Sequence, residues 1–560
     1  MGEPADKISP PVLADTGNGF SVFYRNRFLY SRRFPAKHPE ETAAAADILP
    51  GTLVLLFSPL LGYGVRTLLQ HVPDGVFVLA VEHDAALFHL SRDFFSRTGL
   101  DAGENKCFRL IFAPEPETVT HFLDEGLSGH PPFRRCIRLD LSGGAALYAG
   151  FYRQAEFLAA EYVSVFWKNR ATLIRLGRKY AENIFKNCGE LAAGIPDAIL
   201  LQAGAVRKPL VVAGAGPSLG MATGFLRENR KGLFLLAVEA AVPALQAAGI
   251  RPDLIITVEA QIWINRAFCG NYPDCRFPAD IPVLADFTSR PQKRGKKKHT
   301  SFFLTPYTRA EFLRRLASKK TACMEIPPLG SVGLAALEAA GKLRANITLP
   351  VFFTGLDFSW GSGFSHAEGT PQVRECRIRA DRLSPLEEKR AEAAFAGVRT
   401  GTQNGGIFSN EAMRGYAKLC AARFAGKGFF RLGEGGLPDG FPSAAFSAAA
   451  QEIRKHPPAG NPESGPAPES GAENGIRRRA ADFLQEEEQR LLNLRAILTG
   501  ADKTADNAGL SRLLQEADYL YLHFPDYTGA ESVSLRRDFL NRVRVELEFF
   551  LKIIRTARGR

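Results

Sequence analysis

The sequence predicts an α/β protein: a Rossmann-like central domain with a mostly parallel sheet, preceded by a smaller α/β domain and followed by a helical domain. Three observations support this prediction. Short, fully apolar runs alternate with stretches of helical periodicity in the first two domains. One of these runs, Leu210–Ala213, ends in a glycine turn where a helix begins. After residue 475, apolar residues recur at three- and four-residue intervals.

A length of 560 residues is too long for one ordinary core, so several domains are expected. We place the boundaries where the pattern of apolar residues changes. The predicted segments are an amino-terminal Rossmann-like α/β domain over residues 1–150, a helical connector over 151–195, a central α/β domain over 196–440, a disordered linker over 441–475 and a carboxyl-terminal helical domain over 476–560. The linker contains the low-complexity stretch HPPAGNPESGPAPESGAENG.

The amino-terminal domain begins with a predicted β-hairpin, because residues 18–34 alternate apolar and polar around Asn26. An α/β unit follows, with a strand at Thr52–Phe57, a helix at Val65–His71 and a second strand at Val76–Val81 that ends in Glu82. The same outline occurs in methyltransferases and dinucleotide-binding folds, whose cofactor loops need glycine. Because residues 58–61 are Ser-Pro-Leu-Leu, we interpret this domain as structural.

The connector and the central domain continue the alternation of helices and strands. Residues 151–188 carry helical periodicity. The other predicted strands are Phe108–Phe112, Cys136–Leu141, Leu233–Val238, Leu254–Val258, Ile281–Ala285, Ser301–Leu304 and Val351–Thr354, and the predicted helices of the central domain are Ala240–Ala248 and Ser331–Leu343. Alternation of this kind predicts a mostly parallel sheet with ligands at the carboxyl ends of its strands.

The stretch Gly214-Ala215-Gly216-Pro217-Ser218 is a predicted strand-to-helix elbow. Its glycines allow a close approach of a ligand, and Pro217 suits the first helical turn because its missing N–H would lack an intrahelical partner. Free backbone N–H groups at a helix start attract anions, helped by the helix dipole. The elbow is neither a Walker loop nor a full GxGxxG fingerprint. It is therefore either a cradle for a nucleotide phosphate or only a tight turn.

Polar side chains follow three further strands at the same sheet edge. They are Glu239, Glu259, and Asp357 with His366 in the segment FTGLDFSWGSGFSHAEGT. A carboxylate at Glu259 or Asp357 could orient a substrate hydroxyl, and histidine can accept a proton at neutral pH. The alternative for His366 is a surface histidine in a glycine loop. Trp263 and Trp360, just past two strand ends, could stack on a base or sugar or could simply pack.

The carboxyl third differs in pattern from the rest of the chain. Arg374–Phe395 is charged and rich in alanine, which favours one helix on an exposed insertion. The predicted helices of the tail are Ile476–Leu498, Leu510–Leu522 and Leu535–Ile554. Together they are expected to form a bundle.

The composition limits the possible partners and compartments. The net charge of +12 favours a phosphorylated or polyanionic partner, but the basic run Gln292–His299 has no interleaved aromatic residue, so we expect a solvated loop and no nucleic-acid binding. The eight cysteines are scattered without metal spacing, and even Cys269 and Cys275 lack a nearby histidine, so no metal site is expected. No signal peptide or membrane-spanning run is found, and we expect a cytoplasmic protein.

Four motifs, in this order and spacing, resemble a known family. They are VVAGAGPSL, LLAVEAAVPALQAAGIRPDLIITVEAQ, GSVGLAALEAA and VFFTGLDFSWGSGFSHAEGT. Over residues 200–440 the chain resembles the central domain of the motility-associated factor (Maf) flagellin glycosyltransferases. That domain belongs to a wider group together with the archaeal 6-hydroxymethylpterin diphosphokinase (MptE)-like proteins. It is also similar to bacterial sialyltransferases of the GNGPSL type. Its Glu259-Ala260-Gln261 stands where Maf sequences usually have Asp-Pro-Gln.

The resemblance implies transfer of a nonulosonic acid, of the pseudaminic or legionaminic type, from a CMP donor to Ser or Thr hydroxyls of flagellin. Carried over by position, Gly214, Ala215, Gly216, Pro217 and Ser218 would hold the nucleotide phosphate and ribose, and Glu239 and Glu259 would line the nucleotide pocket. Ser331, Asp357 and His366 would lie on the sugar and acceptor side. The catalytic candidates are thus His366, Asp357 and Glu259. No cofactor beyond the donor substrate and no metal is expected.

Two alternatives remain open at this point. One is an ATP-dependent enzyme similar to 6-hydroxymethylpterin diphosphokinase, which would need magnesium. The other is a flagellar chaperone or scaffold without catalytic activity, in which the helical tail binds the partner.

Overall fold

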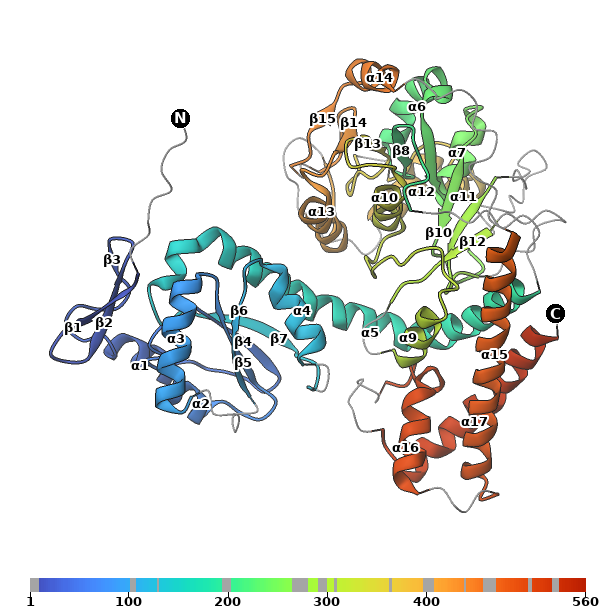
Figure 1. Cartoon of the computed structure of the whole chain (residues 1–560). Helices are drawn as coiled ribbons and strands as arrows, with labels where there is room; N and C mark the ends of the chain where they lie inside the picture. Colours follow the sequence, from blue (N-terminus) through green and yellow to red (C-terminus); the bar gives the residue numbers. More distant parts are fainter. Residues whose placement is uncertain are drawn as a thin grey trace. The chain divides into compact units, whose positions relative to one another are not determined.

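The computed structural model describes thirteen ranges of the chain. These are residues 10–100, 107–127, 130–193, 203–263, 281–290, 300–306, 310–361, 365–395, 407–437, 440–456, 470–501, 506–525 and 533–559. The basic run 292–299, Cys269 and Cys275 lie outside them. The chain forms two compact units, Met1–Ile174 with Phe524–Val533, and Arg175–His523 with Ser534–Arg560. We call them unit 1 and unit 2 (Figure 1).

Unit 1 begins with the predicted hairpin. Strands β1 (Val12–Asp15), β2 (Phe20–Tyr24) and β3 (Arg27–Phe28) form an antiparallel sheet. The two turn residues Arg25 and Asn26 both have positive φ, 47° and 61°. This geometry is that of a type I′ turn, which matches the twist of two hydrogen-bonded strands and explains why an asparagine lies at the turn.

The second sheet of unit 1 is parallel, with the strand order β6-β5-β4-β7. Its strands are β4 (Thr52–Phe57), β5 (Phe77–Glu82), β6 (Phe108–Phe112) and β7 (Arg135–Leu139), and its helices are α1 (Lys37–Ala44), α2 (Val65–His71), α3 (Ala85–Thr98) and α4 (Glu117–Glu125). Every residue of β4 and β5 is buried, as expected for a parallel sheet covered on both faces. The predicted α/β fold of this part is confirmed.

Glu82, at the end of β5, is fully buried. Its two carboxylate oxygens accept hydrogen bonds from Ser58 Oγ (2.7 Å) and from the Tyr152 hydroxyl (2.8 Å). Burial raises the pKa of Glu82 to about 7. Because protein groups satisfy this carboxyl, the arrangement favours the interpretation of the domain as structural.

Helix α5 (Ala149–Ala192) is one continuous helix of 44 residues, longer than the predicted helical stretch 151–188. Its first part belongs to unit 1 and its last part to unit 2. Trp167 donates a hydrogen bond from Nε1 to the carbonyl of Phe133 in unit 1 (2.7 Å). In unit 2, Phe185 packs against three aromatic rings, those of Phe483, Tyr519 and Phe550.

The core of unit 2 is an eight-stranded sheet with the order β12-β11-β10-β9-β8-β13-β14-β15, and each described pairing in it is parallel. The strands are β8 (Leu210–Ala213), β9 (Phe234–Val238), β10 (Leu254–Thr257), β11 (Val283–Asp286), β12 (Thr300–Phe303), β13 (Val351–Thr354), β14 (Phe429–Leu432) and β15 (Ser443–Ala444). The associated helices are α6 (Ser218–Glu228), α7 (Val242–Ala247), α9 (Glu311–Ser318), α10 (Val332–Leu343), α11 (Pro371–Arg379), α12 (Leu386–Phe395), α13 (Glu411–Phe424) and α14 (Phe446–Lys455). The predicted Rossmann-like sheet is therefore confirmed.

Two predictions for this part differ from the structure. Residues 374–395 were expected as one helix, but α11 and α12 are separated by a turn in which Asp381 Oδ1 accepts hydrogen bonds from the backbone of Leu383 and Ser384, and Pro385 follows. Residues 441–475 were expected as a disordered linker, but the described part of this stretch contains β15, α14 and the start of α15, while residues 457–469 lie outside the described ranges. Phe446 of α14 packs on Phe225 of α6 with a ring separation of 5.6 Å.

The carboxyl-terminal helices are α15 (Ser470–Leu498), α16 (Asn507–Glu516) and α17 (Arg537–Arg558). Helices α15 and α17 pack against each other, as Figure 1 also shows. No helix in the described part of the chain is both long and apolar enough to cross a bilayer.

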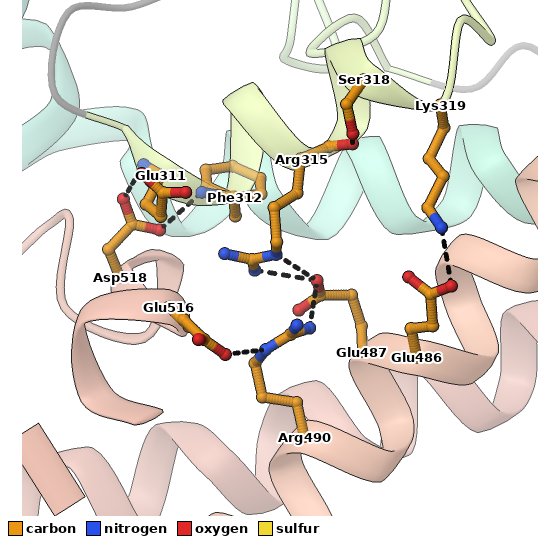
Figure 2. A network of polar contacts seen from close by, with 10 residues as sticks. All are labelled: Glu311, Phe312, Arg315, Ser318, Lys319, Glu486, Glu487, Arg490, Glu516 and Asp518. Carbon is orange, nitrogen blue, oxygen red and sulfur yellow. Dashed lines mark hydrogen bonds and ion pairs between the residues drawn. The ribbon is translucent and has the colours of Figure 1, made fainter. Parts of the chain in front are cut away.

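A polar network joins α9 of the sheet domain to these helices (Figure 2). Glu487 of α15 is 1% exposed, and its Oε1 accepts hydrogen bonds from Arg315 of α9 (2.8 Å) and from Arg490 (2.7 Å). Asp518 accepts hydrogen bonds from the backbone N–H groups of Glu311 (2.5 Å) and Phe312 (3.2 Å), and so caps α9. The carboxyl-terminal segment thus supplies hydrogen-bond acceptors to helix α9 of the sheet domain.

Glu486 and Glu487 allow a matched test of this network. Replacing Glu487 by Gln is expected to lower the free energy of unfolding of unit 2 by about 3 kcal/mol, because two arginines lose their shared buried carboxylate. Replacing Glu486 by Gln is expected to cost at most about 1 kcal/mol, because Glu486 in its ion pair with Lys319 is 51% exposed. Urea unfolding followed by circular dichroism measures both. Equal losses for the two variants would contradict this assignment.

Candidate functional site

The candidate site lies where the order of the central sheet reverses. From β8 the chain adds β9, β10, β11 and β12 on one side, and it then returns to add β13, β14 and β15 on the other. Strands β8 and β13 are therefore neighbours, with Ala213 opposite Thr354. In open parallel sheets, ligands bind beyond the carboxyl ends of the strands at such a switch point. The glycine elbow and the loop that starts at Gly355 both lie there.

These two loops are in direct backbone contact. The N–H of Gly214 donates to the carbonyl of Thr354, and the N–H of Gly216 donates to the carbonyl of Gly355, each at 2.8 Å. A Cβ atom on Gly214 would lie 2.2 Å from the Gly355 oxygen, and a Cβ on Gly355, whose φ is 69°, would lie 2.2 Å from the Gly214 oxygen. The glycines are thus required for one loop to pass the other.

Asp357 caps the helix that follows the elbow. Its Oδ2 accepts a hydrogen bond from the N–H of Ser218 at 3.0 Å, and the Ser218 Oγ accepts one from the N–H of Gly355 at 2.7 Å. Asp357 is 8% exposed, and burial raises its pKa while the contacts with Ser218 lower it. The sequence predicted outward-pointing N–H groups at this helix start. Instead, both N–H groups at this helix start bond within the protein, that of Gly216 to the Gly355 carbonyl and that of Ser218 to the Asp357 carboxylate, which lies where an external anion was expected.

Glu239 and Glu259 form a pair of neighbouring carboxyl groups. Glu239 directly follows β9 and Glu259 lies two residues after β10. The Oε2 atom of Glu239 is enclosed and has no hydrogen-bond partner among the described residues. Burial, with a smaller contribution from the charge of Glu259, raises the pKa of Glu239 to about 8. The Oε1 atom of Glu259 accepts a hydrogen bond from the N–H of Gln261 at 2.7 Å. Because this pKa of Glu239 lies above neutral pH, the carboxyl of Glu239 is mostly protonated at pH 7.

His366 is attached to the elbow through its neighbour. The N–H of Ala367 donates to the carbonyl of Ala215 at 2.9 Å. The Nδ1 of His366 lies 3.1 Å from Ser365 Oγ, and burial lowers the pKa of His366 below its ordinary value of 6.5. The imidazole is therefore neutral at pH 7 and can accept a proton.

Ser331 is the N-cap of α10, where its Oγ accepts a hydrogen bond from the N–H of Gly333 at 3.2 Å. A Cβ on Gly333 would lie 2.5 Å from Leu356 Cδ2, and a Cβ on Gly214 would lie 2.4 Å from the same atom. The start of α10, the elbow and the Asp357 loop therefore meet at Leu356.

The two tryptophans have different environments. Trp360 is 8% exposed, and its backbone pairs with that of Phe408 through hydrogen bonds of 2.9 and 2.8 Å, so it is a packing residue. Trp263 is 51% exposed and follows the Glu259 loop. It remains a candidate for stacking on a ligand.

Some residues that shape the site were missed in the sequence. The N–H of Leu437 donates to the carbonyl of Asp357 at 3.0 Å, and a Cβ on Gly436 would lie 2.8 Å from that same oxygen. Arg431 donates to the carbonyls of Gly435 (2.6 Å) and Leu437 (2.7 Å). The signal for this segment is the apolar run before the glycines in FFRLGEGGLPDG, which resembles the first elbow in outline.

Three comparisons place the chain among known proteins. Residues 182–363 match the family described as 6-hydroxymethylpterin diphosphokinase MptE-like. A protein of Treponema pallidum (strain Nichols), described as uncharacterized, is 34% identical over 564 aligned positions that cover 97% of this chain and 95% of the relative. The structure of a MAf glycosyltransferase from Magnetospirillum magneticum AMB-1 matches with a TM-score of 0.49 and 15% identity, over 98% of this chain and 91% of that one.

Gly216 and Gly220 provide a test of the contact between the loops. Alanine at position 216 would place Cβ 2.3 Å from Asp357 Oδ2 and 2.8 Å from the Gly355 oxygen, so we expect a loss of about 1–3 kcal/mol in the free energy of unfolding. Alanine at Gly220, in the same helix α6, meets no atom within 4 Å and is expected to stabilise by about 0.5–1 kcal/mol. Urea unfolding measures both changes, and a stabilised Gly216→Ala protein would overturn the described contact.

Proposed function

We propose that this chain, which belongs to the same family as the Treponema pallidum protein and contains an MptE-like domain, is a glycosyltransferase that transfers a nonulosonic acid from a CMP donor to Ser or Thr of flagellin. The order and spacing of the four Maf-like motifs support this choice of donor and acceptor. The observation that carries the proposal is the pair Glu239 and Glu259 beside a glycine elbow at the switch point of a parallel sheet.

The nucleotide is proposed to bind beside the elbow and the carboxyl pair. In dinucleotide-binding folds, an acidic residue about 20 residues after the glycine turn binds the ribose hydroxyls, and Glu239 occupies the equivalent strand end. A buried oxygen without a partner costs free energy, which a ligand hydroxyl would recover. Residues 214–218 are proposed to line the phosphate and ribose. A phosphate can use the N–H of Ser218 only by displacing Asp357.

In the proposed step, the bond between the anomeric carbon of the sugar and the phosphate oxygen breaks, and the electron pair leaves with CMP. The acceptor hydroxyl oxygen bonds to the same carbon, and its proton goes to a base. His366 is the proposed base, because its imidazole is neutral and half-buried. Glu259 and Ser331 are proposed to orient the sugar and the acceptor. Because Asp357 is buried and bonded to Ser218, its geometry favours holding the loop over contacting the substrate.

The match of residues 182–363 favours one alternative, an ATP-dependent diphosphokinase acting on a pterin. Both functions would use a nucleotide at the same sheet edge. The two nucleotides differ in the nucleobase and in the number of phosphates, and only the diphosphokinase reaction needs magnesium. Binding measurements therefore distinguish the two functions.

Calorimetric titration with CMP, and separately with ATP and magnesium, tests the proposal. We expect CMP to bind the full chain, Gly216→Trp to abolish binding because a large side chain cannot fit against Asp357, and Gly220→Ala to retain it. Binding of ATP with magnesium but not CMP would replace the transferase proposal by the diphosphokinase. Binding of neither would favour the scaffold.

The pH dependence tests the residue roles. If protonated Glu239 donates to a ribose oxygen, CMP affinity falls as the pH rises through about 8, because the raised pKa marks where the proton is lost. The Glu239→Gln variant keeps a neutral donor, and its affinity for CMP is expected not to change across that range.

If His366 is the base, the loss of transfer at acidic pH begins only below pH 6.5, where the imidazole takes up a proton. The variant His366→Asn is then expected to lower kcat about 10²–10⁴-fold. Undiminished transfer by His366→Asn would eliminate it as the base.

A further inference from the structure

We propose that Asn183 and Asn187 of α5 are positioning residues that hold the loop carrying Glu259 in place for the reaction. Both side chains lie on one face of α5, four residues apart, and each is 1% exposed. The functional part of this inference rests on the proposed role of Glu259. We call the hydrogen bonds from these two side chains to the loops the clamp. The clamp itself depends only on contacts within unit 2.

Asn183 bridges the loops after two neighbouring strands. Its Nδ2 donates to the carbonyl of Ala260, in the loop after β10, at 3.0 Å and to the carbonyl of Thr288, in the loop after β11, at 2.8 Å. A side-chain amide nitrogen has two hydrogens, so both are used. Ala260 directly follows Glu259, and the contact therefore fixes the backbone next to the candidate carboxylate.

Asn187 makes the same kind of contact one helical turn later. Its Nδ2 donates to the carbonyls of Phe287 and Ser289, each at 2.9 Å. The two loops are also joined to each other, because Ser289 Oγ donates to the carbonyl of Thr257 (3.1 Å) and the N–H of Arg290 donates to the carbonyl of Glu259 (2.9 Å). Asn183 and Asn187 thus hold four carbonyls of a cross-linked pair of loops.

The side-chain amides of Asn183 and Asn187 supply hydrogen-bond donors that the buried loop carbonyls would otherwise lack. Loop carbonyls that are buried next to a helix cannot bond to the helix backbone, whose own groups are paired within it. Losing one buried donor leaves carbonyl groups without partners, which costs more than the bond itself contributes. Only a short side chain with two donor hydrogens on one atom can bridge two carbonyls in this way.

The same stretch of α5 also contacts the carboxyl-terminal helices. Phe185, between the two asparagines, packs on Phe483 of α15 and Phe550 of α17 with ring separations of 6.3 and 5.9 Å. One helical segment therefore bonds to the Glu259 loop through its amides and packs on the tail through its ring. By this geometry, the packing of the tail contributes to the position of Glu259.

Hydrogen exchange of the full chain, followed by mass spectrometry, tests the clamp without any ligand. In Asn183→Leu and Asn187→Leu, we expect amides of residues 258–263 and 286–290 to exchange about tenfold faster, because the loops open more often, while residues 214–219 are unchanged. The control is Cys188→Ala, which removes a fully buried side chain from the same helix without removing an amide. CMP affinity, measured by calorimetry, is expected to fall about tenfold in the asparagine variants.

Unchanged exchange in both loops would overturn the clamp, as would equal acceleration in Cys188→Ala. Weaker CMP binding with unchanged loop exchange would also overturn it, because the effect would then not pass through the loops. If the loops exchange faster but the unaltered protein binds no CMP, the clamp stands and the proposed transferase function fails. The two proposals therefore fail separately.

Discussion

The close contact between Gly214 and Gly355 is the constraint on which the candidate site depends. Two loops leave neighbouring parallel strands and pass each other with backbone oxygens where side chains would otherwise lie. This contact brings Asp357 to the start of α6, and the Ala215 carbonyl then bonds to the His366 loop. Glycine is therefore needed here for the crossing of two segments of the chain, which is a stricter requirement than a tight turn alone.

Much of the fold could be predicted because its strands are short, apolar and fully buried. Thr52–Phe57 and Val351–Thr354 have the same bounds in sequence and structure. Strand β14 was missed because a charged residue, Arg431, interrupts its short apolar run, and in the structure this part of the strand is only half-buried. The elbow and the strand-end carboxylates could be found from their positions. The bond between Asp357 and Ser218 could not, because it joins segments 139 residues apart in sequence. The asparagines of α5 gave no signal, since a polar residue within a long helix usually faces solvent.

The two parallel sheets of the chain treat the same position differently. In unit 1, Glu82 is the last residue of β5, the neighbour of β4. In unit 2, Glu239 directly follows β9, the neighbour of β8. Glu82 is surrounded by Ser58 and Tyr152, which satisfy it, whereas Glu239 keeps one enclosed oxygen without a partner among the described residues. At the same place in two parallel sheets, the protein thus satisfies the carboxyl with its own side chains in unit 1, whereas in unit 2 the described residues leave one carboxyl oxygen unsatisfied.

The cap that Asp518 supplies to α9 has a consequence for how the chain can be divided. Residues 457–469 would be a natural place to cut when judged by composition alone. A fragment ending at residue 456 would lose the acceptor for the first N–H groups of α9, the partner of Arg315 and the rings around Phe185. Segments that look separable along the sequence therefore share buried contacts, and a different helical tail would have to supply the same acceptors and rings to the sheet domain.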